Sequence, residues 1–442
     1  MSALIDRIAD EHAAAAATAA AAAAAGAASA VGHLRRRRAL DALLASGLPS
    51  TRNENWRYAN LRPLERVRFT PAEAAPAERL SGRLPPAIPG FLRYVFVDGS
   101  LARDAAPGAS AHSAAPVRVS TGAPAPVAEC ADLPPDAAFA LLNEAFAVDG
   151  LRIEAGSAQA AQGDPTRIEV IFVASAPAQV GASYPRLVVI AAPHARLEVI
   201  ERHVGLADEA SFIDSAVEVH AREGSSIEHY RIQQLGSRAV WMDTLHASVA
   251  RAATYRVHGF ALGAQSARST VLVRLDGPGA ELGLHAVAAG DRQQVLDTYA
   301  VVDHAAANTR TEESFRGIAA GRSRVAFNGK IIVQPGSHGT DSSQSLRGLL
   351  AGTDAEIDVR PQLEIYTDDV RCSHGATTGK LDETMLFYLL SRGLDRDTAQ
   401  RLLEWAFLED VVSKVRVAEL RRHIESSLAG RLREPETLQE LL

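Results

Sequence analysis

The sequence predicts a mainly β protein, with a parallel β-helix (solenoid) core flanked by N-terminal and C-terminal α-helical regions. Two observations favour this fold. Short runs with alternating apolar and polar residues fill residues 167–378, which is typical of strands with one buried face. Turn-then-strand openings recur about every 28 residues, a spacing typical of stacked repeats, at Pro193, Glu223, Arg251 and Pro278. A Greek-key sandwich has a similar number of strands and is the alternative.

Residues 1–66 are expected to form an N-terminal helical region. The alanine-rich run from Ala13 to Ala25 follows acidic rather than basic residues, unlike a secretory signal. Alanine is also too weakly apolar for a convincing membrane span. We interpret the run as a helix-prone leader, and the basic run from Arg35 to Arg38 as a solvated helix face rather than a patch for an anionic partner.

Residues 67–166 are expected to form an irregular connector with short strands and helices, because prolines, glycines and alanines accumulate there. The stretch from Leu92 to Asp98 is its one strand candidate. In the β-helix core that follows, residues 167–378, the inward faces of the strands stack on the turns above and below. Apolar residues are therefore needed at every second position, as at Leu197 and Val199.

Residues 379–442 are predicted to form a C-terminal helical domain. Asp382 is a suitable N-cap for a first helix, and Gly393 is well placed to end it. A second helix is expected to begin after Asp395. Its apolar stripe is predicted to consist of Leu402, Leu403, Ala406 and Phe407.

Composition limits the possible partners and compartment. The net charge of -7 argues against general affinity for nucleic acids, which need basic surface. The two cysteines, Cys130 and Cys372, are far apart in the sequence, so we expect a reducing, cytoplasmic compartment. The chain has no GxxxxGK[ST] motif, so we do not expect it to hydrolyse ATP itself.

Cys372 and His374 form the most informative pair in the chain. On an extended segment their spacing would place both side chains on one face, with Cα atoms about 7 Å apart. Thiolate sulfur and imidazole nitrogen are good donors to iron or zinc. Two ligands do not complete a metal site, however, and a structural role is the alternative. The missing ligands could come from another chain.

Two enzymatic alternatives involve the same segment. Adjacent Asp368 and Asp369 resemble the acidic clusters of carbohydrate-active β-helix enzymes. Neighbouring strand residues would point to opposite faces, however, so a role in a turn or a salt bridge is favoured for the pair. Cys372 and His374 could instead form a nucleophile and base in a stand-alone thiol or metal-binding enzyme, but no orienting third residue is visible. Other histidines in strand patterns are interpreted as surface or satisfied core residues, for example His203, His220, His229, His258 and His285.

The run Pro361–Leu394 (PQLEIYTDDVRCSHGATTGKLDETMLFYLLSRGL) closely resembles the C-terminal signature of SufD in the SufB/SufD family, the scaffold subunits of the SUF iron-sulfur cluster assembly machinery. Gly375 follows His374, whereas the related SufB segment typically has Glu there. The resemblance extends to NGKIIVQPGSHGTDSSQSLRGLL and, more loosely, to NENWRYANL. One departure is SQSLRGLLAG, where family members more often carry an Asn/Lys-rich stretch; it affects no proposed ligand.

This resemblance implies a non-catalytic scaffold that pairs with a SufB-like subunit and binds a SufC-like ATPase through its C-terminal helices, as in a SufBCD complex. Leu402, Leu403 and Phe407 are the candidate partner-binding residues. His374 would contribute to a transient iron-sulfur cluster at the subunit interface, and Cys372 would be a less certain participant. A cysteine desulfurase system could act through the complex. Flavin binding is left open.

Overall fold

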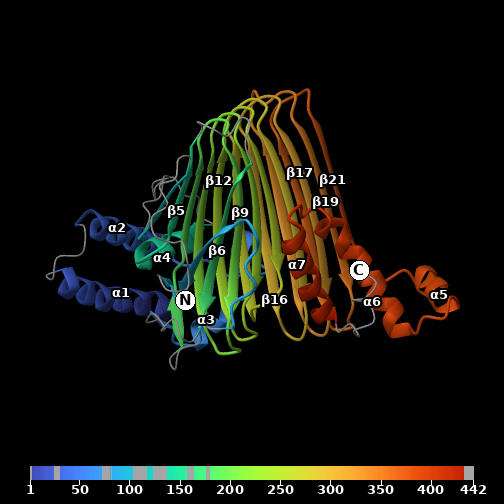
Figure 1. Ribbon diagram of the computed structural model, residues 1–442, viewed down its shortest axis with the longest axis horizontal. Coiled ribbons are helices and arrows are strands. Elements are labelled where there is room, and N and C mark those ends of the chain that lie inside the picture. The colour runs from blue at the N-terminus through green and yellow to red at the C-terminus, as the bar shows by residue number, and fades with distance from the viewer. Residues whose placement is uncertain are drawn as a thin grey trace.

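A computed structural model describes residues 2–23, 30–71, 80, 82–102, 117–122, 137–156, 164–175 and 180–432. Its body is a solenoid in which two long sheets face each other (Figure 1). The predicted parallel β-helix is therefore confirmed. Cys130 lies outside the described residues. In the part of the chain that the structure describes, no helix has the length and apolar character needed to cross a membrane.

Sheet A contains the even-numbered strands of the solenoid from β8 onward, together with β4 and β5. Its hydrogen-bonded path runs through β4 (Val117–Thr121), β5 (Leu151–Ala155), β8 (Arg186–Ala191), β10 (Phe212–Ala221), β12 (Val240–Val249), β14 (Ser266–Leu275), β16 (Val295–His304), β18 (Arg324–Val333) and β20 (Glu356–Ile365). The short strand β7 (Gly181–Ser183) pairs with β10, and β1 (Thr70–Pro71) pairs with β7.

Sheet B is the opposite wall. Its path runs through β3 (Ser100–Leu101), β2 (Leu92–Val97), β6 (Thr166–Ala174), β9 (Arg196–Gly205), β11 (Ser226–Gln234), β13 (Thr254–Ala261), β15 (Glu281–Gly290), β17 (Arg310–Ala319), β19 (Asp341–Leu350) and β21 (Arg371–Gly379). β2 and β5 pair in parallel with the solenoid strands β6 and β8. The two sheets thus begin before residue 167.

Each turn of the solenoid adds one strand to each sheet, so residues about one repeat apart lie side by side. Tyr255, for example, is in register with Ile227 on one neighbouring strand and with Leu282 on the other. The apolar inward side chains form one continuous core between the sheets. Leu197 and Val199 are both buried in it, as their period-two pattern predicts.

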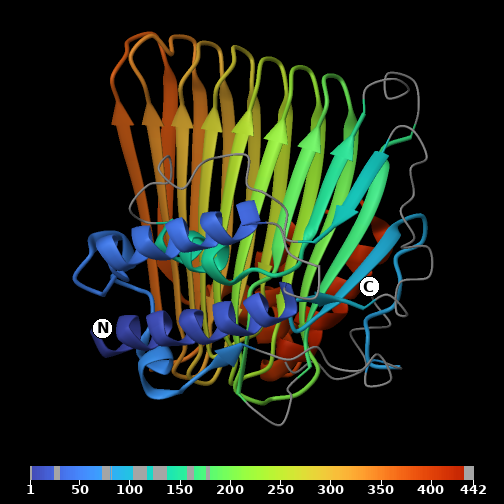
Figure 2. The same ribbon diagram turned by 90° about the vertical axis from the view of Figure 1, so that its left-hand side faces the viewer.

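Helices cover the outer face of sheet A at the N-terminal end of the solenoid (Figure 2). They are α1 (Ser2–Ala23), α2 (Ala30–Ser46) and α4 (Ala138–Phe146). Two short helices, η1 (Glu54–Trp56) and α3 (Arg62–Arg66), come between α2 and α4 in the sequence. The sequence predicts a solvated basic run, but the run is not wholly solvated, because Arg35 of α2 forms an ion pair with the buried Glu144 of α4. Arg37 and Arg38 are exposed.

Three helices follow the last strand: α5 (Glu383–Ser391), α6 (Arg396–Val412) and α7 (Ala418–Leu432). The Asp382 carboxylate accepts a hydrogen bond from the Thr384 backbone N–H at 2.7 Å. Asp395 caps α6 in the same way, accepting from Thr398 at 2.9 Å. Gly393, which follows α5, has φ +93°. These residues bound α5 and begin α6 as the sequence predicts.

Helices α6 and α7 pack on the outer face of sheet B, but α6 does not use the predicted stripe. Its buried residues are Ala399, Trp405, Leu408, Val411 and Val412. Leu402, Leu403 and Phe407 are only partly buried, and Ala406 is exposed. The prediction failed because α6 buries a face that is offset from its most leucine-rich stretch.

Candidate functional site

The last turn of the solenoid is open. β20 ends the path of sheet A and β21 ends that of sheet B, so within the described residues neither strand has a neighbour on its outer edge. Their residues are half-buried or exposed, whereas strands one turn earlier are mostly buried. This end therefore presents both unpaired backbone groups and inward side chains that no further turn covers.

Cys372 and His374 lie on β21 and share its inward face. They are in register with Ser342 and Gln344 of β19, which are 1% and 3% exposed and therefore point into the solenoid. Cys372 packs partly against the core, whereas His374 is exposed. The common face predicted from the spacing of the two residues is present.

The Cys372 thiol is poorly suited to act as a nucleophile. Burial, and to a smaller extent the Asp341 carboxylate, raise its pKa above the ordinary value. A thiol of raised pKa carries little thiolate at neutral pH. The cysteine is free rather than disulfide-bonded.

The opposite wall of the open end is apolar. Ile357, Val359 and Leu363 of β20 pack partly against the end of the core. Among the residues that the structure describes, no group of three or more His, Cys, Asp or Glu side chains could hold a metal ion. Cys372 and His374 thus form an incomplete set of metal ligands opposite the apolar residues of β20.

The sequence interpretation did not include two buried polar residues, Glu313 and Gln344, on the strands that precede β21 in sheet B. Glu313 of β17 is in register with Gln344, and the Gln344 Nε2 donates a hydrogen bond to Glu313 Oε2 at 2.7 Å. Burial raises the pKa of Glu313 to about 7. The available signal was the similar spacing of Glu313, Gln344 and His374, which is close to one repeat.

The acidic pair, Asp368 and Asp369, lies in a turn rather than on a face of the solenoid. Asp368 and Asp369 are exposed residues of the bend between β20 and β21, in agreement with the turn role favoured by the sequence. Asp369 has φ 57°, a conformation that aspartate tolerates in turns. Its carbonyl accepts a hydrogen bond from the Gly339 N–H at 2.8 Å. A role in the turn accounts for this residue.

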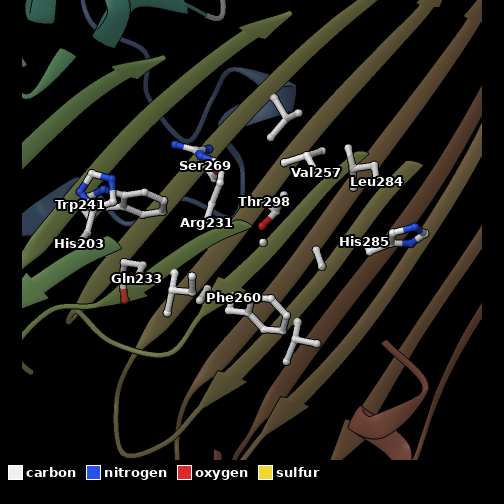
Figure 3. A pocket seen from close by; sticks show the side chains of 16 residues that line it. His203, Arg231, Gln233, Trp241, Val257, Phe260, Ser269, Leu284, His285 and Thr298 are labelled. Atoms are coloured by element: carbon white, nitrogen blue, oxygen red, sulfur yellow. The ribbon is translucent and has the colours of Figure 1, made fainter. Parts of the chain in front are cut away.

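An ionic cluster lies deeper between the sheets. Arg231 Nε and Nη2 each donate to Glu201 at 2.8 Å, and its Nη1 and Nη2 donate to Asp243 at 2.8 and 2.7 Å. A cavity of about 60 Å³ adjoins the cluster, with His203 and Trp241 in its lining (Figure 3). Polar groups so far from water depend on one another for hydrogen bonds.

The five strand histidines named in the sequence interpretation are core residues with polar neighbours, in agreement with that interpretation. All five are buried. The contacts are His203 with Glu201, His220 with Ser248, His229 with Tyr255, His258 with Glu228, and His285 with Ser314.

The C-terminal helices expose a second apolar surface. Met385, Phe387 and Tyr388 of α5 are 58%, 70% and 56% exposed. α5 extends beyond α6 and away from the solenoid (Figure 1). The sequence interpretation placed partner-binding residues on α6 and missed this surface, although three large apolar residues within four positions of the helix were visible.

Together these features define a class of protein: a β-solenoid with an open end that carries an incomplete Cys/His pair, next to helices with an exposed apolar surface. Residues 172–407 match the family described as "SUF system FeS cluster assembly, SufBD core domain". The chain belongs to this family, and it is an iron-sulfur cluster assembly protein. The resemblance first seen around Cys372 and His374 is confirmed.

Individual relatives agree with the family. The chain is 29% identical over 407 residues to the iron-sulfur cluster assembly protein SufD of Escherichia coli, covering 89% of this chain and 91% of that protein. An iron-sulfur cluster assembly SufBD family protein of Synechocystis is 24% identical over 258 residues, 57% of this chain and 55% of its own length. One of Mycobacterium leprae is 27% identical over 248 residues, 53% and 61% respectively.

Proposed function

We propose that this chain is a non-catalytic scaffold subunit that pairs, through the open end of its solenoid, with a SufB-like subunit. A transient iron-sulfur cluster would assemble at the interface. The observation that carries the proposal is the incomplete pair, Cys372 and His374, on the inward face of a strand that has no neighbour on its outer edge within the described residues. An incomplete ligand set is the expected state when the remaining donors belong to a partner.

Pairing at this end has a clear physical basis. Unpaired N–H and C=O groups along β20 and β21 are a template for strands of another chain. A partner that covered this end would also remove Ile357, Val359 and Leu363 from water, and apolar burial drives association.

His374 is the stronger ligand candidate of the two. It is exposed at the open end, and an imidazole nitrogen is a good donor to iron. Cys372 would have to release a proton against its raised pKa, although a bound metal can remove that proton. We therefore assign the primary role to His374 and a supporting one to Cys372.

The C-terminal helices, in residues 379–442, are proposed to bind a SufC-like ATPase. ATP hydrolysis would occur in that partner, whose binding to one scaffold arrangement more tightly than another would open the subunit interface. Leu402, Leu403 and Phe407 are partly buried and could contribute. The exposed α5 residues are better placed, because large apolar side chains are frequent anchors at interfaces. A cysteine desulfurase system could supply sulfur to the complex; flavin binding remains unassigned.

Phe387→Ser is expected to weaken binding of the SufC-like ATPase roughly tenfold or more, because it removes an exposed aromatic anchor. The melting temperature of the chain should not change, since Phe387 is 70% exposed. Calorimetric titration with the ATPase measures the effect. Val148→Ser, at another site that is 68% exposed, is the matched control and should bind normally. If Phe387→Ser bound the ATPase as tightly as the wild type does, α5 would not be part of the ATPase-binding surface.

Co-purification tests the proposed function as a whole. The full chain is expressed with a SufB-like and a SufC-like protein, and the mixture is passed through affinity and size-exclusion columns. We expect one complex that contains all three chains and that acquires iron and sulfide during anaerobic reconstitution. Elution of the chain alone, under conditions in which the other two chains are folded, would refute the scaffold role.

A further inference from the structure

Three polar residues form a ladder along the inner face of sheet B. Glu313 on β17 is in register with Gln344 on β19, and Gln344 is in register with His374 on β21. Inward side chains in register on neighbouring strands lie side by side, because adjacent strands are about 4.8 Å apart. The ladder leads from the buried interior to the open end.

One hydrogen bond, to Glu313, orients the Gln344 amide. Its Nε2 donates to Glu313 Oε2 at 2.7 Å, and both residues are nearly fully buried, with 3% and 1% exposed. The Gln344 Oε1 is buried without a hydrogen-bond partner. A buried acceptor without a donor is unfavourable, so Gln344 has an unfilled position for an N–H.

The opposite sheet leaves room for this arrangement. Gly329 of β18 faces the ladder, and a Cβ atom at that position would lie 2.7 Å from both Gln344 Nε2 and Glu313 Oε1. Any side chain there would displace the hydrogen-bonded pair. The space around Glu313 and Gln344 is therefore matched to the two polar groups.

We propose that Gln344 is a positioning residue for His374: its Oε1 accepts the N–H of one ring nitrogen, which leaves the lone pair of the other nitrogen for a metal. Glu313 holds the Gln344 amide in the required orientation. Metal-binding histidines commonly donate their second ring N–H to such an acceptor, which fixes the tautomer and the ring direction. The consequence for cluster assembly rests on the proposed role of His374 as a ligand.

Nitrogen NMR of the full chain tests the positioning. The chain is labelled with [15N]histidine, and the signals of His374 are assigned by their loss in His374→Ala. At pH 8 we expect one tautomer in the wild type, and the averaged tautomers of a free imidazole in Gln344→Leu. Gln344→Glu retains an acceptor and should restore the single tautomer. Averaged tautomers in the wild type would overturn the proposal, even if Gln344→Leu did not fold.

A second readout separates this inference from the proposed function. Outer-shell partners typically contribute 10–100-fold to metal affinity, so Gln344→Leu in the complete complex should lower cluster content about tenfold, with recovery in Gln344→Glu. A change of tautomer without loss of cluster would support the positioning and remove the His374 ligand role. An unchanged tautomer in Gln344→Leu would overturn the positioning, whatever the cluster content.

Discussion

Arg231→Met is expected to lower the free energy of unfolding by about 3–5 kcal/mol, because it leaves two buried carboxylates without their shared cation. Glu201 and Asp243 are 0% and 1% exposed, and both accept hydrogen bonds from the Arg231 guanidinium. Burial by itself would raise the pKa of Glu201, but Arg231 holds it well below its usual range. Removing Arg231 therefore exposes the full cost of burying the charge.

Urea unfolding followed by circular dichroism measures this effect. Arg274→Met is the matched control: its guanidinium pairs with Asp276 at 2.7 Å but its side chain is 53% exposed, so the expected loss is at most about 1 kcal/mol. Adding Glu201→Gln and Asp243→Asn to Arg231→Met should recover part of the stability. An Arg231→Met variant as stable as the control would show that the cluster does not depend on this cation.

Leu363→Arg is expected to weaken pairing with a SufB-like subunit by about 100-fold or more. Leu363 lies on the inward face of β20 and packs only partly against the end of the core. In the free chain an arginine at this place can reach water with its charged end. In a paired solenoid the same charge would be enclosed without a partner, which is strongly unfavourable.

Analytical ultracentrifugation of the mixed subunits gives the affinity. Glu364→Gln provides the control, because Glu364 is the neighbouring position of the same strand and its carboxylate pairs with Lys330 at 2.8 Å. We expect this variant to pair normally. The melting temperature of both chains alone should remain close to the wild-type value. Undiminished pairing by Leu363→Arg would mean that partners meet elsewhere on the molecule.

Much of the fold follows from rules that act over short distances. Alternation at Leu197 and Val199, together with the recurring turns, favours a solenoid over a Greek-key sandwich. Asp382 and Asp395 were recognisable as N-caps because a carboxylate needs only the backbone of the next turn. The shared face of Cys372 and His374 followed from the period of a strand.

Other features depend on contacts between distant segments. The register that brings Glu313 and Gln344 behind His374 depends on the length of every intervening turn. Arg35 was assigned to solvent because its buried partner, Glu144, lies on another helix. The buried face of α6 is selected by sheet B rather than by the leucine content of the helix. No local pattern contains this information.

The central claim is that this chain contributes His374 to a cluster shared with its partner. The measurement that tests it most directly is the iron and acid-labile sulfide content of the reconstituted three-protein complex with His374→Ala in place of the wild-type chain. We predict that the variant complex assembles with unchanged subunit composition and retains less than about a tenth of the wild-type cluster, as expected when a metal ligand is lost. A wild-type cluster content in the intact variant complex would contradict the claim.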